Sequence, residues 1–494
     1  MKDSKYQTAI YEAVENDSCN LMISAVAGSG KTTTLIGCAD RVPINRSVAF
    51  LAFNNAIVDE LKERVKRQNV HITTMHSLCW RSVMKHYNFQ CELKPNKSVK
   101  YIVQVCKKHE IPEKKINYHI YVYSTLIDLI RHDLAFEIED IINLAAKHSH
   151  LIGEREAEML REILNLMNEN TKEFDFTDMI YRAVLDGVRL PKFDFVFVDE
   201  SQDLSKLQQM VVSRIRSRRG RMVAVGDPHQ AIYGFAGADV DSYNKLKNLF
   251  PNTVELPLSV NYRCGSRIIK EAKKLNPQIQ AFKKNGEGEV RNGFVDEIKG
   301  KDWVLCRNVK PLVLTNLYLL SKGIKSYVRG SDIGMGLIAI LNKGGSANVK
   351  TALVKYKASI HQERARLIKL GVKNPDQTEK IDMMKQKLDI LTVLSDGILL
   401  TKNLIDKIKR IFKDQGEGVM LSTIHKSKGL ENDTVFFLCP ELIPSQYAEQ
   451  PWEFQQEYNL EYVAITRAKS KLIYIEDYDT VLQTNKEILK KLEV

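Results

Sequence analysis

The chain has 494 residues, 44% of them hydrophobic and 27% charged, and this length exceeds what one hydrophobic core usually supports, so we expect several globular domains. No apolar run approaches the roughly 18 residues of a membrane span, and the opening MKDSKYQTAI holds no apolar signal core, which excludes membrane insertion and secretion as expectations. Eight scattered cysteines without a C-x-x-C pair favour reduced thiols in a cytoplasm over structural zinc, and 73 Lys and Arg against 61 Asp and Glu leave a net charge of +12 that suits a polyanionic partner.

The first element with a chemical signature is an apolar run, residues 21–23, followed by AVAGSGKTTT at residues 25–34. This order predicts a buried strand, a loop containing Gly28 and Gly30, and a helix that opens at Lys31. Backbone N–H groups of such a loop converge on phosphate oxygens, and the helix N-terminus adds a favourable dipole. We expect Lys31 to reach the β- and γ-phosphates and Thr32 to bind Mg²⁺.

A helical block follows at residues 81–173, with helices expected near 97–110, 118–134, 137–150 and 153–170. Short β-branched or aromatic runs flank this block and a later one. They lie at residues 48–53, 193–198, 222–225, 303–305, 419–421, 435–438 and 472–475. Several are continuously apolar and end in Gly or Asp, which is typical of buried strands in a parallel sheet.

The strand at 193–198 delivers Asp199 and Glu200 to the carboxyl end of its sheet, where ligands bind in open α/β folds. Asp199 is a candidate Mg²⁺ ligand, and Glu200 is a candidate general base for an attacking water. Two acidic residues after a strand are common by themselves. Paired with the glycine loop, they predict nucleotide hydrolysis.

The strand at 222–225 is followed by Gln230, whose amide can sense a γ-phosphate because it both donates and accepts hydrogen bonds. Tyr233 and Phe235 come next among small residues. These two rings form either a hydrophobic core or a platform on which unpaired bases stack.

Residues 337–413 hold sixteen Lys and Arg against seven Asp and Glu, which accounts for nine of the twelve net charges. Apolar residues recur there at helical spacing, with lysines on the other faces. This segment is either a solvated helical surface or a surface that faces nucleic acid. The whole pattern predicts an α/β protein with two parallel-sheet cores, each interrupted by a mainly helical insertion.

With these motifs in place, the chain resembles a superfamily 1 helicase of the UvrD/Rep/PcrA type over its whole length and in the family's order. Beside the glycine loop and VDESQD, the strings that carry the resemblance are AFNNAIVDELKERV (52–65), TMHSL (74–78), VGDPHQAIYGFAGAD (225–239), LPLSVNYRCGSRI (256–268), LSTIHKSKGLEND (421–433) and EYNLEYVAITRAKSKL (457–472). Departures at Ala56, Phe235, Ala236, Tyr458-Asn459 and Asn432 weaken single contacts to DNA or ATP without removing a catalytic group, and Ala25 stands where the general phosphate-loop pattern has its first Gly.

The resemblance implies a role for each matching residue. Lys31, Asp199, Glu200, Gln230, Arg263 and Arg467 would be catalytic, with the two arginines reaching ATP from the second core. ATP would be bound by Gln7, Ala27, Gly28, Ser29, Gly30, Lys31, Thr32, Thr33, Tyr262, Arg263, Glu431 and Arg467, and Mg²⁺ by Thr32 and Asp199. DNA would be bound by Phe53, Asn55, His76, Tyr233, Phe235, Thr423 and His425.

The resemblance also implies two RecA-like motor domains with inserted subdomains. Residues 1–80 and 174–258 would form domain 1A, 81–173 the helical insertion 1B, 259–334 and 415–494 domain 2A, and 335–414 a shortened, basic insertion 2B. We expect an ATP- and Mg²⁺-dependent helicase that moves 3′ to 5′ on single-stranded DNA. Its expected partners are single-stranded DNA and single-strand/duplex junctions, with no membrane partner, and it is compatible with a monomer. The expected location is the bacterial cytoplasm or, if the protein is phage-encoded, the host cytoplasm. The alternatives are a translocase that displaces proteins without processive unwinding, an ATP-gated DNA-binding switch, and the same motor on RNA.

Overall fold

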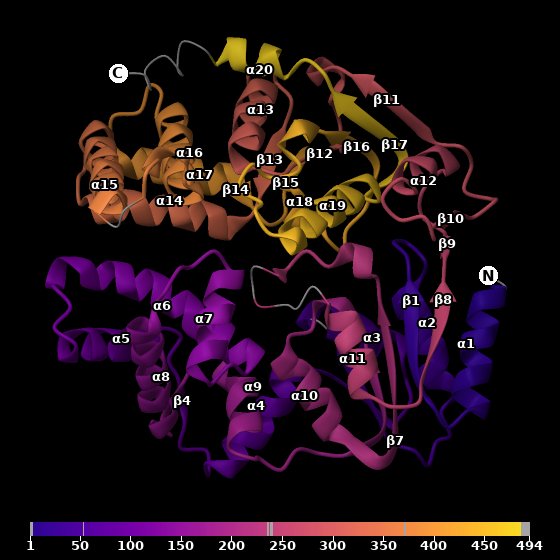
Figure 1. The fold of residues 1–494 in the computed structure, drawn as a ribbon. Coiled ribbons are helices and arrows are strands. Elements are labelled where there is room, and N and C mark those ends of the chain that lie inside the picture. The colour runs from indigo at the N-terminus through magenta and orange to yellow at the C-terminus, as the bar shows by residue number, and fades with distance from the viewer. Residues whose placement is uncertain (1–2, 53, 235–236, 238–240, 370–371, 486–494) are drawn as a thin grey trace. The chain divides into compact units, whose positions relative to one another are not determined.

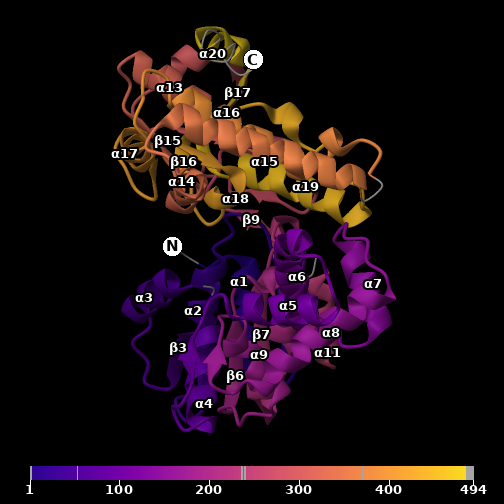
Figure 2. The same cartoon turned by 90° about the vertical axis from the view of Figure 1, so that its left-hand side faces the viewer.

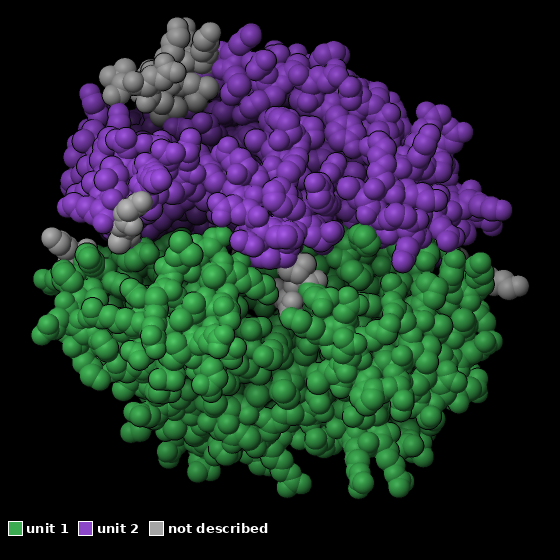
Figure 3. All heavy atoms as spheres, viewed as in Figure 1, with its two compact units in different colours: residues 1–260 green, residues 261–494 purple. Residues whose placement is uncertain are grey.

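The computed structural model describes residues 3–52, 54–234, 237, 241–369 and 372–485. The chain divides into two compact units, residues 1–260 and 261–494, which are coloured separately in Figure 3. Each unit contains its own parallel β-sheet, so the predicted α/β class with two RecA-like sheets is confirmed.

The sheet of the first unit has six strands in the order β3-β2-β6-β7-β1-β8, and every pair of neighbours in it runs parallel. The strands are β1 (Asn20–Ala25), β2 (Val48–Ala52), β3 (Val70–Thr74), β6 (Phe193–Val198), β7 (Arg216–Gly226) and β8 (Thr253–Leu258). Because all six run in one direction, the chain segments after β1, β6 and β7 leave the sheet at the same edge.

Both faces of this sheet are buried, which explains why its strands read as unbroken apolar runs. Alternate residues point to opposite faces. Phe195 and Phe197 belong to a core cluster with side chains of α1 (Lys5–Asn16), α2 (Lys31–Arg41) and α3 (Asn55–Arg64). Val196 and Val198 belong to a second cluster on the other face.

The second cluster extends from the sheet into the helical insertion. It includes side chains of α4 (Met75–His86), α5 (Lys97–Lys108), α6 (Glu113–Asp133), α7 (Ile138–Lys147), α8 (Glu154–Glu169), α9 (Asp178–Leu185), α10 (Lys206–Ile215) and α11 (Ser242–Leu249). Figures 1 and 2 show α5 to α8 gathered beside one another within this unit. The four helices expected between 97 and 170 are therefore present.

Two short strands that the sequence pattern missed join the ends of this insertion. β4 (Glu92–Leu93) pairs in parallel with β5 (Glu173–Phe174). A two-residue strand is too short to produce a recognisable alternation of apolar and polar residues. The pair brings the start and the end of the helical block together.

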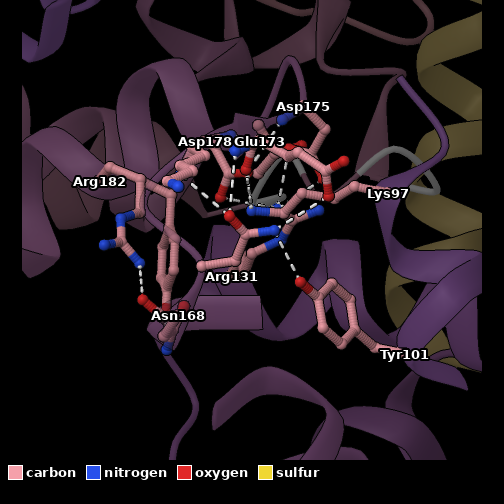
Figure 4. Close-up of polar contacts among 12 residues, drawn as sticks. Lys97, Tyr101, Arg131, Asn168, Glu173, Asp175, Asp178 and Arg182 are labelled. Atoms are coloured by element: carbon pink, nitrogen blue, oxygen red, sulfur yellow. Dashed lines mark hydrogen bonds and ion pairs between the residues drawn. The ribbon is translucent and has the colours of Figure 1, made fainter. Parts of the chain in front are cut away.

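A buried ionic cluster also fixes the insertion against α9 (Figure 4). The Arg131 guanidinium on α6 donates to both oxygens of Asp175 at 2.9 Å and to Asp178 at 3.2 Å. Lys97 on α5 forms an ion pair with Asp178 and donates to the Glu173 carbonyl at 3.2 Å. Burial lowers the pKa of Lys97 and raises that of Asp175, and the attraction of their oppositely charged partners offsets these shifts only in part.

The sheet of the second unit has seven parallel strands in the order β11-β17-β16-β12-β15-β13-β14. They are β11 (Glu289–Gly293), β12 (Trp303–Cys306), β13 (Ser326–Arg329), β14 (Phe412–Lys413), β15 (Val419–Thr423), β16 (Asn432–Phe437) and β17 (Ala468–Ile475). A separate two-stranded sheet contains β9 (Val260–Asn261) and β10 (Gln280–Ala281).

Helices of the second unit are α12 (Ser266–Ala272), α13 (Val309–Ser321), α14 (Ser331–Gly344), α15 (Val349–Lys369), α16 (Glu379–Leu394), α17 (Thr401–Ile411), α18 (Ile424–Ser427), α19 (Pro451–Ile465) and α20 (Tyr478–Thr484). The basic segment forms α14 to α17, which lie beside one another in Figure 1 and share one core cluster with the sheet. The boundaries of the four predicted subdomains stay predictions. Among the described residues, no helix combines the length and the apolarity that crossing a membrane requires.

Candidate functional site

The loop between β1 and α2 has the backbone geometry of a phosphate cradle. Gly28 and Gly30 have φ angles of 63° and 80°, a left-handed conformation that strains any residue with a side chain. Gly30 is the N-cap of α2, so this helix begins without a side-chain cap. The loop also buries Ala27 and Ser29, and the Ser29 hydroxyl has no hydrogen-bond partner among the described atoms. A phosphate group fits here, since it would accept from both the helix N-terminus and this hydroxyl.

Four predicted residues meet where β1 and β6 end. The Lys31 ammonium lies 2.7 Å from Glu200 Oε2, and the Thr32 hydroxyl donates to Asp199 Oδ2 at 2.9 Å. Glu200 has a left-handed backbone, with φ of 52°, which is unusual for a residue with a side chain. Backbone strain of this kind concentrates at functional sites, because only there does the surrounding structure maintain it.

Burial and neighbouring charges shift the pKa values of two ionisable side chains in this group, Asp199 and Lys31. It raises the pKa of Asp199 to about 6, the neighbouring Glu200 carboxylate adds to that shift, and Lys31 opposes it. For Lys31, burial lowers the pKa, but attraction to Glu200, Asp227 and Asp199 outweighs burial and the net shift is upward. At neutral pH, Lys31 is therefore a cation facing carboxylates.

Thr32 and Asp199 offer the hard oxygen donors that Mg²⁺ prefers. Within the described residues, no group of three or more His, Cys, Asp and Glu side chains is arranged to hold a metal. A magnesium ion at Thr32 and Asp199 would therefore complete its shell with water and phosphate oxygens, as is usual for this ion beside nucleotides.

Asp227 is a member of the site to which the sequence analysis gave no role. It is fully buried at the end of β7, and burial raises its pKa while Lys31 lowers it. Its Oδ2 accepts a hydrogen bond of 2.7 Å from Gln230 Nε2. The sequence signal was an acidic residue directly after a buried strand, the same signal that identified Asp199.

Gln7 lies next to the helix that the phosphate loop opens. Its Oε1 accepts from the Ser4 backbone N–H at 3.0 Å, and its Nε2 donates to the Thr34 hydroxyl on α2 at 3.3 Å. Thr33, also predicted at the nucleotide, accepts a hydrogen bond of 3.0 Å from Arg64. The first unit thus brings Gln7 and Thr33 close to the phosphate loop.

The second unit brings its own predicted residues together. Arg263 forms an ion pair with Glu431 and donates to the Thr466 carbonyl at 3.2 Å, and Lys469 lies 3.0 Å from the other oxygen of Glu431. Arg467 is buried and donates from all three guanidinium nitrogens, to the carbonyls of Val463 and Leu430 and to the Thr466 hydroxyl.

Tyr262, one of the predicted ATP contacts, which the resemblance would stack on adenine, is half-buried and lies in the same segment as Arg263. Its ring packs against Phe282 with a centroid distance of 4.8 Å and an angle of 53°. Phe282 is an aromatic neighbour that the sequence analysis did not select. Two tilted rings at a partly open position form a suitable face for a flat base.

The predicted DNA contacts His76 and His425 occupy equivalent places in the two units, each following a threonine that ends a strand and caps a helix, and Thr74 is a residue that the sequence prediction did not name. Thr74 ends β3 and caps α4 through the Ser77 N–H at 3.2 Å, while Thr423 ends β15 and caps α18 through the Lys426 N–H at 3.4 Å. In each case a histidine follows two residues later. Burial lowers the pKa of His76, and burial together with Arg307 lowers that of His425 to about 4, so both rings are neutral at pH 7.

The remaining DNA candidates differ in how they are presented. Asn55 is exposed in the first turn of α3, and its neighbour Asn54 caps that helix through the Ile57 N–H at 3.0 Å. Tyr233 is half-buried after β7. Phe53 and Phe235 lie outside the described residues.

Comparison with known proteins agrees with this geometry. The sequence profile of the UvrD/REP helicase N-terminal domain matches residues 6–251, and that of the UvrD-like helicase C-terminal domain matches residues 418–475, together well over half the chain. The chain belongs to the UvrD-like helicase family. The first matched region contains the phosphate loop, Asp199, Glu200 and Gln230, and the second contains Thr423, Glu431 and Arg467, whereas Tyr262 and Arg263 lie between the two regions.

Individual relatives of this UvrD-like chain are distant. F-box DNA helicase protein 1 of Schizosaccharomyces pombe is 25% identical over 94% of the chain and 56% of its own length. F-box DNA helicase 1 of Gallus gallus is 26% identical over 96% of the chain and 49% of its own length. ATP-dependent DNA helicase PcrA of Staphylococcus aureus is 26% identical over 59% of the chain and 41% of its own length. The chain thus spans about half the length of the curated relatives it matches.

Proposed function

We propose that this UvrD-like chain is an ATP- and Mg²⁺-dependent DNA helicase that moves 3′ to 5′ along single-stranded DNA and separates duplexes. The observation that carries the proposal is the meeting of Lys31 with Glu200 and of Thr32 with Asp199 at the carboxyl edge of a parallel sheet. The three relatives described above are all DNA helicases, which supports DNA as the track.

Each residue gathered at the phosphate loop of the first unit has a task in this proposal. Lys31 exchanges its contact with Glu200 for the β- and γ-phosphates, which frees the Glu200 carboxylate to accept a proton from the attacking water. Magnesium, held by Thr32 and Asp199, would neutralise charge on the phosphates. Gln230, whose Nε2 donates to Asp227, would respond to the γ-phosphate through its amide.

In this proposal, the second unit stabilises the negative charge that develops during phosphoryl transfer. Arg263 and Arg467 are its sources of positive charge, and a guanidinium in that role is worth about 10³ to 10⁵ in rate. Thr74 with His76 and Thr423 with His425 are proposed to bind DNA. Neutral histidines fit hydrogen bonding to the backbone better than an ion pair with it.

The test is an ATPase assay with and without single-stranded DNA, run beside strand displacement on 3′-tailed and 5′-tailed duplexes. We expect DNA-stimulated turnover, displacement on the 3′-tailed substrate alone, and loss of both in Lys31→Ala. ATPase stimulation by RNA but not by DNA would overturn the assignment of DNA as the track. Displacement of bound streptavidin without duplex separation would favour a protein-displacing translocase, and stimulation without movement would favour an ATP-gated switch.

A further inference from the structure

The side chain of Gln202 occupies a central position that the proposed function does not use. It is 1% exposed in the short turn Ser201–Asp203 that follows Glu200. Its Nε2 donates to Glu200 Oε2 at 2.6 Å and to Asp203 Oδ2 at 3.2 Å, and its Oε1 accepts from the Asp227 N–H at 3.0 Å. Carboxylates on one side and an N–H on the other permit only this orientation of the amide.

Both the Lys31 ammonium, at 2.7 Å, and the Gln202 amide, at 2.6 Å, donate to Glu200 Oε2. Lys31 cannot keep this contact unchanged while it binds a phosphate, whereas Gln202 has no such second task. The left-handed backbone of Glu200 stores strain of about 1 kcal/mol or more, so its conformation depends on neighbouring contacts.

We infer that Gln202 is the positioning residue that holds the Glu200 carboxylate in place during turnover and ties it to Asp227, the residue that follows the neighbouring strand β7. The inference rests on the proposed function, since it presupposes that Glu200 is the base. The Asp227 side chain in turn accepts from Gln230, so Asp227 links the base, through its backbone N–H and Gln202, to the residue proposed to sense the γ-phosphate.

Gly226 supports this inference independently. A Cβ atom at Gly226 would lie 2.5 Å from Ser201 Oγ and 2.8 Å from Gln202 Oε1, closer than carbon and oxygen atoms approach without displacement. The end of β7 thus needs a glycine for the Gln202 amide to reach the Asp227 N–H. Any side chain there would push the amide away from its present position.

The first test is Gln202→Leu in the full chain, with kcat and KM for ATP measured at saturating single-stranded DNA. Leucine fills the space but neither donates nor accepts. We expect kcat to fall about 10- to 100-fold, because general-base catalysis contributes about 10² to 10⁴ and the base itself remains. KM for ATP should stay within about twofold, since Gln202 binds the base rather than the nucleotide loop.

Gln209→Leu is the matched control. Gln209 is a second buried amide of the same unit, on α10, and its Nε2 donates to the Ser242 hydroxyl at 3.1 Å. The same substitution there should lower the free energy of unfolding by a similar amount but leave kcat unchanged. An equal loss of kcat in both variants would assign the effect to stability and overturn the inference.

Gly226→Ala provides a second route to the same contact. We expect a similar fall in kcat, and no further fall when Gly226→Ala is combined with Gln202→Leu, because both changes remove one interaction. Additive losses would overturn the inference, as would normal kcat in Gln202→Leu. A wild-type chain that does not hydrolyse ATP would instead refute the proposed function.

Discussion

Arg263 and Arg467 hold their guanidinium groups in different ways, although the sequence assigns both the same task. Arg263 is bound chiefly by the Glu431 carboxylate, which also has Lys469 as a partner. Arg467 is buried and bonded to two backbone carbonyls and a hydroxyl of its own unit. Arg467 therefore contributes to the stability of the fold besides any role in catalysis.

We expect Arg263→Ala and Arg467→Ala each to lower ATP turnover by about 10³ or more. Arg467→Ala should lower the free energy of unfolding more than Arg263→Ala does, because it removes three hydrogen bonds of a buried guanidinium and each buried polar group left without its partner costs about 1–3 kcal/mol. Steady-state ATPase and urea titration measure the two effects. Full turnover in Arg263→Ala would remove it from the proposed mechanism, and unchanged stability of Arg467→Ala would contradict its buried hydrogen bonds.

At the scale of elements, the attachment of the helical insertion depends on a few buried charges. Asp178 is 1% exposed and is shared by Lys97 and Arg131, which belong to α5 and α6. Removing one partner of a buried ionic cluster leaves an uncompensated charge. The packing of α5 and α6 against α9 therefore depends on each charge of the cluster keeping its partners.

We expect Asp178→Ala to lower the free energy of unfolding by about 3–5 kcal/mol. The control is Glu60→Ala, which breaks the surface pair of Glu60 with Arg64 on α3 and should cost about 0.5 kcal/mol or less. Urea titration followed by circular dichroism compares them. Equal effects of the two substitutions would show that the buried cluster does not stabilise the insertion.

Some elements were predictable from sequence and others were not. The strands β1, β2, β6, β12, β15, β16 and β17 appear where continuous apolar runs predict them, because burial on both faces leaves no other composition. β4 and β5 were missed because two residues carry no pattern. β7 begins at Arg216, earlier than its apolar part at 222–225, because backbone pairing with β6 continues along polar residues.

At the scale of the whole molecule, buried histidines link folding to pH. Burial and nearby charges lower the pKa of His132 and His148 in the first unit, and of His425 in the second, to about 4. The unfolded chain takes up these protons near pH 6.5, whereas the folded chain does so only near pH 4. Their contribution to stability is therefore complete above about pH 6.5 and is lost as the pH falls toward 4.

Buried carboxyls have the opposite effect, since a raised pKa, as at Asp199, favours the folded state at lower pH. The histidine contribution is therefore measured as a difference. We expect the double variant His132→Gln and His148→Gln to lose less stability than the wild type between pH 7 and pH 5 in urea titrations. Parallel stability profiles of the wild type and the double variant would show that the two histidines take up protons at the same pH in the folded and the unfolded chain, which would contradict their lowered pKa values.

The sequence by itself determined which strands are buried and which residue types follow them, because local composition reports burial and because the phosphate loop and VDESQD are contiguous strings. Lys31, Thr32, Asp199 and Glu200 are identifiable from these two strings. Only the tertiary structure decided what meets across the sheet. β7 lies between β1 and β6, and this neighbourhood brings Asp227 and Gly226 against Gln202, which lies more than twenty residues earlier in the chain. Hydrogen bonds between strands distant in sequence depend on strand order, and no single stretch of sequence carries that order.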